Sequence, residues 1–106
     1  MIHLKIDKNK PKGWFAGPWN SDLEVSIGYA NEGINELHYH TKMREVYLIA
    51  KGESVAKVND QKVKLVAGDL LVVEPNEKHT FLSNSDEYMH FVIHSPSVKG
   101  DKVSVD

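Results

Sequence analysis

The segment HYHTKMRE contains three side chains that could bind a metal ion: His38, His40 and Glu45. On a β-strand, residues i and i+2 point to the same side, so the imidazoles of His38 and His40 face one way. Glu45 stands at an odd separation from both histidines, so one straight strand cannot place all three together. If the chain reverses through residues 41–44, Glu45 lies on the returning strand beside His40. Two nitrogens and one carboxylate oxygen then converge.

A fourth candidate ligand, His79, follows the segment GDLLVVEPNEK. Pro75 ends one apolar run there and His79 begins the next, so a turn fixes the position of the imidazole. Each residue alone also has an ordinary explanation. A His-x-His pair can arise by packing or chance, Glu45 could be a solvated hairpin carboxylate, and His79 could cap a turn. The combination is more specific than any of its members.

The elements that must position these side chains are short strands. In residues 23–29 the apolar side chains alternate at period two and share one face: Leu23, Val25, Ile27 and Tyr29. In residues 61–66 two apolar side chains point inward and two lysines outward: Val63 and Leu65, and Lys62 and Lys64. Three further runs are apolar on both faces or nearly so: residues 45–50, 70–74 and 90–94.

Turn signals separate these runs at residues 51–53, 58–61, 67–69 and 75–78. In the second of them, Asn59 and Asp60 tolerate a positive φ. About six to nine short strands without helical periodicity predict an all-β sandwich or small barrel. Residues 1–20 are expected to form an ordered loop or edge segment. Trp14 and Trp19 would pack there over one end of the barrel or at a dimer contact, and direct contact with a ligand is the alternative.

The order of these residues resembles the two motifs of the cupin family. The first motif is matched by Gly33, His38, His40, Glu45 and Gly52, and the second by Gly68, Pro75 and His79. The resemblance covers residues 33–84 and implies an antiparallel jelly-roll β-barrel, with residues 1–106 forming one cupin domain. It also implies that one divalent ion (Mn, Fe, Ni, Co or Zn) is bound by His38, His40, Glu45 and His79.

Two positions depart from the cupin pattern. Glu77 stands where the family usually has glycine, so a positive φ there would add strain of about 1 kcal/mol, or the turn differs. Ser83 stands at the usual asparagine position, and Asn84 follows it. Neither departure affects a candidate ligand.

Three histidines and one carboxylate leave two positions open on an octahedral ion, unlike the closed tetrahedral set of a structural zinc site. Open positions admit a bidentate oxygen ligand such as a diol, a hydroxy acid or an enediol, and the metal could activate dioxygen or polarise a carbonyl group. We therefore expect a metal-dependent oxygenase or isomerase acting on a small polar or sugar-like molecule. The alternative is a cupin without turnover, which binds a small molecule or uses the metal only for stability.

Two further residues are candidates for contact with the substrate. Tyr47 shares the inward face of Glu45, although a phenol that titrates near pH 10 is a weak base. His90 lies on one face of its run with Val92 and His94, opposite Met89, Phe91 and Ile93. If that face lines the interior, His90 contacts the substrate or supports the metal ligands; otherwise it is a hydrogen-bonded histidine of the barrel wall.

Charge and composition limit the classes of partner. The 106 residues carry a formal net charge of −2, and Arg44 is the one arginine, so nothing predicts attraction to nucleic acid. The N-terminal region has no apolar run long enough for a signal peptide or membrane span. There are no cysteines, which fits a reducing cytoplasm. We expect a soluble, cytoplasmic homodimer, because cupins of this size commonly pair and pairing would cover exposed edge strands.

Overall fold

The computed structural model describes residues 1–106 and contains ten β-strands and no helix. The strands are β1 (Lys12–Ala16), β2 (Ser26–Ala30), β3 (His38–Tyr39), β4 (Arg44–Lys51), β5 (Glu53–Val58), β6 (Gln61–Val66), β7 (Leu70–Val73), β8 (His79–Asn84), β9 (Met89–Ser95) and β10 (Val103–Ser104). The predicted all-β class is therefore confirmed. The structure contains no helix with the length and apolar character needed to cross a membrane.

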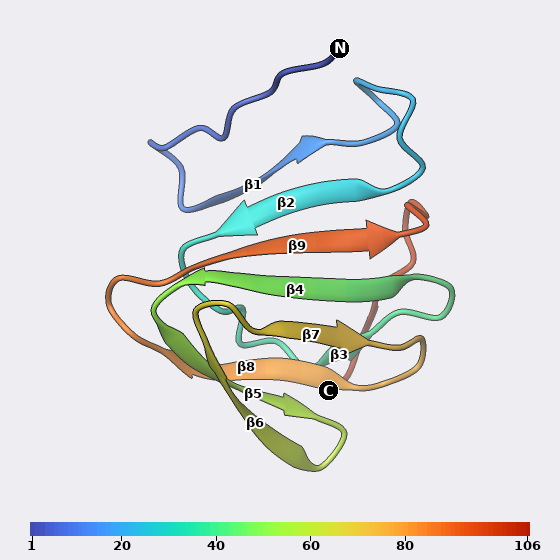
Figure 1. The fold of residues 1–106 in the computed structure, drawn as a ribbon. Helices are drawn as coiled ribbons and strands as arrows, with labels where there is room; N and C mark the ends of the chain where they lie inside the picture. Colours follow the sequence, from blue (N-terminus) through green and yellow to red (C-terminus); the bar gives the residue numbers. More distant parts are fainter.

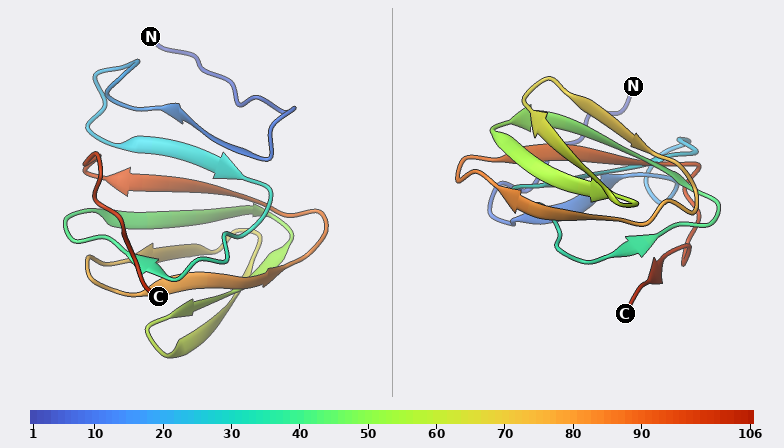
Figure 2. Two further views of the ribbon diagram at one scale, coloured as in Figure 1. Left: turned by 180° about the vertical axis from the view of Figure 1, so that it is seen from behind. Right: turned by 90° about the horizontal axis from the view of Figure 1, so that it is seen from below.

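The strands form two five-stranded antiparallel sheets. The first sheet has the order β1-β2-β9-β4-β7, which runs from top to bottom in Figure 1. The second has the order β10-β3-β8-β5-β6, and its short strand β10 lies beside β3 in both views of Figure 2. Consecutive strands such as β3 and β4 belong to different sheets, so the chain crosses repeatedly between the two.

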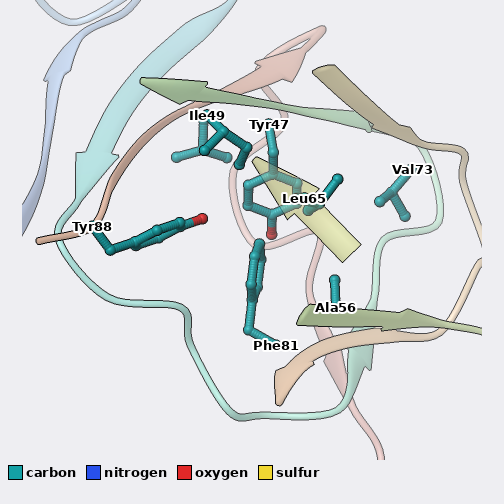
Figure 3. Close-up of a cluster of buried hydrophobic side chains, with 8 residues drawn as sticks. Tyr47, Ile49, Ala56, Leu65, Val73, Phe81 and Tyr88 are labelled. Carbon is teal, nitrogen blue, oxygen red and sulfur yellow. The ribbon is translucent and has the colours of Figure 1, made fainter. Parts of the chain in front are cut away.

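Eight buried side chains from both sheets form the hydrophobic core (Figure 3). They are Tyr47, Ile49, Ala56, Leu65, Val73, Phe81, Tyr88 and Val92. A buried aliphatic or aromatic side chain of this kind stabilises the fold by about 2 kcal/mol. Tyr47 and Val92 also line a large cavity, so they mark the boundary where the packed core ends and the open interior begins.

Of the two turns predicted at residues 51–53 and 58–61, only the second joins paired strands as a hairpin, because β4 and β5 belong to different sheets. Val58 pairs with Gln61 across the turn between β5 and β6, and Asn59 adopts a positive φ of 54°, whereas Asp60 does not. Between β4 and β5, Gly52 has a φ of 77°, and a Cβ atom there would lie 2.6 Å from the carbonyl oxygen of Glu87. Only glycine therefore fits at the end of the first motif.

Strand β2 is shorter than the sequence predicted. It begins at Ser26, so Leu23 is exposed in the preceding loop and does not join the predicted strand face. Ile27 and Tyr29 do share one face, on which they lie opposite Ile93 and Phe91 of β9. The alternation in β6 is as predicted, with Leu65 buried and Lys64 exposed.

In the turn before β8, Glu77 does not have a positive φ, so the strain considered for this position does not arise. The left-handed residue is Asn76, with a φ of 69°, and asparagine tolerates this conformation. The side chain of Glu77 instead accepts hydrogen bonds from the backbone N–H of Glu74 (2.8 Å) and the amide of Asn59 (3.1 Å). Asn76 also donates its backbone N–H to the carbonyl of His40 at 2.6 Å. This hydrogen bond fixes the turn to His40 of the first motif.

Candidate metal centre

Three of the candidate ligands lie in strands of the two opposing sheets, and His40 directly follows β3. His38 and His79 are direct cross-strand partners in β3 and β8 of the second sheet. Glu45 lies in β4 of the first sheet, where its cross-strand partners are Val73 and His94. The predicted chain reversal beside His40 is therefore wrong in detail: β3 and β4 do not pair. Glu45 meets the histidines because the inward sides of the two sheets face each other.

The donor atoms of His38, His40, Glu45 and His79 all lie within 4.8 Å of one another, and all four residues are buried. The structure thus brings together every residue of the predicted ligand set. Nε2 of His38, His40 and His79 lies 3.7, 3.3 and 2.6 Å from the same carboxylate oxygen, Oε1 of Glu45.

Backbone carbonyls orient the three imidazoles. Nδ1 of His38 donates to the carbonyl of Glu36 (2.7 Å), and Nδ1 of His79 donates to that of Glu77 (2.9 Å). Nδ1 of His40 donates to the carbonyl of Asp101 (2.5 Å). Because a carbonyl can only accept, Nδ1 carries the proton in each ring and Nε2 of the neutral ring presents a lone pair. This is the arrangement that protein metal sites use to fix a histidine ligand.

Three lone pairs that point at one carboxylate oxygen leave an excess of acceptors. Nε2 of His40 is the one buried side-chain polar atom with no hydrogen-bond partner. A bound cation would satisfy all of these acceptors together, whereas a proton on one ring satisfies a single contact. The arrangement of donor atoms therefore fits a divalent metal ion, which His38, His40, Glu45 and His79 could hold.

The electrostatics of the cluster favour negative charge on Glu45. Burial alone would raise the pKa of Glu45, but the contacts from the surrounding imidazoles outweigh burial and hold the pKa well below its usual range. For His40, burial disfavours the charged form, but contacts with Glu45 and Asp101 outweigh burial and raise the pKa. Glu45 is therefore an ionised carboxylate in the interior, and the site attracts cations.

His94 belongs to the cluster, although the sequence analysis did not assign it there. Its Nε2 donates to Oε2 of Glu45 at 2.5 Å, on the carboxylate oxygen that the three other histidines do not approach. The signal was present in the sequence, because His94 shares the inward face with His90. What the sequence lacked was the register that pairs His94 with Glu45.

Asp101 is a second residue that the sequence analysis missed. Its carboxylate accepts backbone N–H groups from Thr41 (2.9 Å), Lys42 (2.8 Å) and Met43 (2.8 Å). Burial alone would raise the pKa of Asp101, but these bonds and the one from the Thr41 hydroxyl outweigh it and lower the pKa. The carboxylate thus fixes the loop between His40 and Glu45, while its backbone carbonyl orients His40.

A cavity of about 1270 Å³ opens beside the cluster. Its lining includes the candidate ligands His38, His40 and Glu45, together with Tyr47 and His90. Burial, and the nearby charge of Glu45, raise the pKa of Tyr47 well above its usual value. Burial lowers the pKa of His90 to about 4, so this ring is neutral near pH 7. The structure thus places both predicted substrate-contact residues on the cavity wall.

The two tryptophans lie at the cavity and not in the core. Trp14 is 46% exposed and Trp19 is 58% exposed, and both line the cavity. The ring centroids of Trp14 and His94 lie 4.4 Å apart, with the ring planes tilted by 48°. A Cβ atom at Gly28 or Gly17 would lie 2.9 Å from the ring of Trp14 or 2.1 Å from that of Trp19. Each indole therefore lies against the backbone of a glycine and retains an exposed surface.

The family model of the cupin domain matches residues 27–95 of the chain. No curated protein sequence matches it. Among solved structures, a variant of Streptomyces Pac13 with uridine is 16% identical with a TM-score of 0.74, over 98% of this chain and 84% of that chain. Pac13 is described as a nucleoside dehydratase.

Two other solved structures are similar over most of both chains. The protein plu4264 from Photorhabdus luminescens is 17% identical with a TM-score of 0.69, over 89% of this chain and 86% of that chain. KdgF from Halomonas is 10% identical with a TM-score of 0.67, over 92% of this chain and 89% of that chain. At these identities the likeness concerns the fold.

Proposed function

The chain belongs to the cupin family, and we propose that it is a metal-dependent enzyme that acts on a small polar or sugar-like molecule bound through its oxygen atoms. The observation that carries this proposal is the buried cluster of His38, His40, Glu45 and His79 at the wall of a cavity of about 1270 Å³. A purely structural metal site has no need of such a space. A small-molecule site requires one, and known ligand cavities have similar or smaller volumes of roughly 300–1000 Å³.

Residues of the chain supply the ligand set and the surroundings of the reacting molecule. His38, His40 and His79 would hold a divalent ion through Nε2, and Glu45 would hold it through a carboxylate oxygen. A bound divalent ion would supply a Lewis acid for an oxygen atom of the substrate. His94 would keep the carboxylate of Glu45 in place through its hydrogen bond to Oε2.

The cavity wall favours isomerisation or elimination at a carbonyl-bearing carbon skeleton. Tyr47 is a phenol, which is protonated near pH 7, and His90 is a neutral imidazole. Both can donate hydrogen bonds to an oxygen atom that becomes negatively charged during proton abstraction. An oxygenase is the second candidate, because three histidines and one carboxylate with open positions also suit Fe(II) chemistry.

The cavity mouth supports a ligand that contains a ring. The exposed faces of Trp14 and Trp19 can stack on a sugar or an aromatic ring. Lys12 and Lys99 also line the cavity, and neither forms an ion pair within the chain, so the ligand can carry negative charge. Uridine, the ligand bound in the Pac13 structure, combines a sugar with an aromatic ring and is a reasonable first compound to test.

The experiment begins with metal analysis of protein purified without a histidine tag. The metal-loaded protein is then incubated with a panel of ketoses, aldoses, hydroxy acids and nucleosides in D₂O, and deuterium incorporation or elimination is followed by NMR. Oxygen uptake is measured in parallel. Deuterium exchange would support the isomerase or lyase, and oxygen uptake would support the oxygenase. Stoichiometric metal with ligand binding but no turnover would leave only a binding role.

We also propose that the protein is a homodimer that pairs through the outer face of the first sheet. Val46 lies opposite both Val72 and Ile93, and Leu48 lies opposite Leu70 and Phe91. Leu48, Leu70 and Val72 are exposed. No charged residue occupies these central positions, and depletion of charge is typical of the centre of an interface. A second copy of the chain would cover this surface.

A further inference from the structure

Three buried polar side chains outside the metal cluster form a hydrogen-bonded chain. The hydroxyls of Ser54 and Tyr88 lie 3.2 Å apart, and the hydroxyl of Tyr88 lies 2.7 Å from Nδ1 of His90. Figure 3 shows the Tyr88 hydroxyl directed into the interior of the molecule. All three residues are buried, and His90 is only 1% exposed. A polar chain at this depth requires that each hydrogen atom finds an acceptor.

That requirement gives the chain a direction. Ser54 has no side-chain hydrogen-bond partner other than Tyr88. If Tyr88 donated to Ser54, the hydroxyl hydrogen of Ser54 would be buried without an acceptor, at a cost of the order of 1–3 kcal/mol. Ser54 therefore donates to the Tyr88 oxygen, and Tyr88 donates to Nδ1 of His90. Because Nδ1 accepts, the single proton of the neutral imidazole is on Nε2.

Nε2 is the ring nitrogen of His90 that remains free for a ligand. His90 lines the cavity, and its Nε2 has no partner within the protein. Nε2 of His40 is the one fully buried side-chain polar atom that has no partner. Nε2 of His90 also has no partner, so it is not fully buried. The N–H group of His90 is therefore available to a molecule inside the cavity.

We propose that His90 is a fixed hydrogen-bond donor that binds an acceptor oxygen of the ligand, and that Tyr88 and Ser54 are positioning residues that hold it in this tautomer. The ligand class is one with a carbonyl, carboxylate or alkoxide oxygen at the inner end of the cavity. The inference rests on the proposed function for the presence of such a ligand, but the tautomer itself does not depend on a metal.

The assignment distinguishes two roles that a cavity histidine can have. A neutral ring with its proton on Nε2 has no lone pair toward the ligand, so His90 cannot accept a proton from it through that atom. It can instead stabilise negative charge that develops on an oxygen atom, as neutral donors do in other active sites. Proton abstraction would have to involve another group.

The tautomer is measured by long-range ¹H–¹⁵N correlation spectra of the protein treated with chelator. The expected result is a non-protonated Nδ1 and a protonated Nε2 for His90. Tyr88→Phe removes the donor to Nδ1, so the two tautomers of His90 should become mixed; Ser54→Ala should have a smaller effect in the same direction. A wild-type spectrum with the proton on Nδ1 would overturn the inference, as would an unchanged spectrum in Tyr88→Phe.

The ligand contact is measured with oxalate, a bidentate oxygen ligand, on the zinc-loaded protein. Oxalate should shift the Nε2 proton resonance of His90. The affinity of His90→Leu for oxalate should be lower by a factor of at least about ten, as expected for the loss of a hydrogen bond to a charged group. His90→Gln keeps an N–H donor and should recover part of that loss. Equal affinity in wild type and His90→Leu would overturn the proposed contact.

The two proposals fail in different ways. If the protein bound no zinc, the proposed function would be wrong, while the tautomer of His90 in the metal-free protein would still decide the role of Tyr88. Zinc stoichiometry in Tyr88→Phe should equal that of wild type, because Tyr88 contacts none of the candidate ligands. A changed spectrum with unchanged zinc content therefore identifies a positioning role rather than general damage to the site.

Discussion

Nε2 of His94 lies 2.5 Å from Oε2 of Glu45, while Nε2 of His38, His40 and His79 all approach Oε1 of the same carboxylate. The two oxygens of Glu45 thus have different partners. Oε1 faces the three histidines whose lone pairs converge, and Oε2 is held by a histidine from the neighbouring strand. Glu45 can therefore offer one oxygen to a metal ion while the other is held in place.

This division of partners predicts the effect of mutating His94. His94→Ala should retain one bound metal ion per chain but weaken metal affinity by about 10- to 100-fold, the usual effect of losing a partner of a metal ligand. His94→Gln, which can still donate to Oε2, should lose less. Zinc titration against a chromophoric chelator measures both. Complete loss of binding in His94→Ala would mean that His94 is itself a ligand.

The direct candidate ligands should behave differently. His38→Ala, His40→Ala and His79→Ala should each weaken metal affinity by at least about 100-fold, more than the loss of a supporting residue. Each variant should remain folded, because the barrel has its own hydrophobic core. His3→Ala, which alters a histidine in the N-terminal segment, is the matched control. Metal analysis with far-UV circular dichroism tests both expectations, and stoichiometric metal in all three variants would contradict the site.

Much of this site could be predicted from strand parity alone. Alternation placed Tyr47 on the face of Glu45, and His90 on the face of His94, and both pairs do share an inward face. These predictions worked because they depend on the period of a strand, which is a local property. The grouping of His79 with His38 and His40 was implied by the resemblance to the two cupin motifs and not by parity.

The remaining contacts depend on how distant segments meet. The pairing of Glu45 with His94 requires the register between β4 and β9, and alternation does not fix which residues lie opposite each other. Asp101 stands 61 residues from His40 and fixes its ring through a backbone carbonyl, which any residue type could supply. No residue pattern could therefore have identified it. The prediction that the strand begins near Leu23 was wrong, because the apolar alternation extends into the loop that precedes β2.

Asp101 should be important for both stability and metal binding. Asp101→Ala leaves three backbone N–H groups of residues 41–43 without their acceptor, and we expect it to lower the free energy of unfolding by about 3 kcal/mol. Asp101→Asn keeps the shape and one acceptor oxygen, so its effect should be smaller. Urea unfolding of the metal-free variants gives both values. Losses below about 0.5 kcal/mol for Asp101→Ala would show that the loop does not depend on this carboxylate.

The proposed dimer can be tested at the centre of the apolar surface. Leu48→Glu places a charge where Leu70 and Phe91 surround it, so burying that charge in an interface becomes unfavourable and the dimer should dissociate. Lys51→Glu, at an exposed position of the same strand, is the control for added negative charge. Light scattering at micromolar concentration should give a dimer for wild type and Lys51→Glu and a monomer for Leu48→Glu. A monomeric wild type would exclude the homodimer.

Stability in mild acid should depend on His90. Burial lowers the pKa of His90 to about 4 in the folded protein, against a usual value of 6.5, so the unfolded chain binds this proton first as the pH falls. The contribution of neutral His90 is present above pH 6.5 and is lost as the pH falls toward 4. At pH 4.5 the loss should reach about 2 to 3 kcal/mol, since one pKa unit corresponds to about 1.4 kcal/mol.

The other shifted groups allow this effect to be isolated between pH 6.5 and 4.5. The raised pKa of His40 gives a contribution that is constant below about pH 6.5, and the lowered pKa values of Glu45 and Asp101 give contributions that are lost only below about pH 4.3. His90→Gln cannot titrate but keeps an acceptor for Tyr88. Urea unfolding of the metal-free proteins should therefore show a smaller loss of stability over this interval for His90→Gln than for wild type. Equal losses in the two proteins would mean that His90 is not buried as a neutral ring.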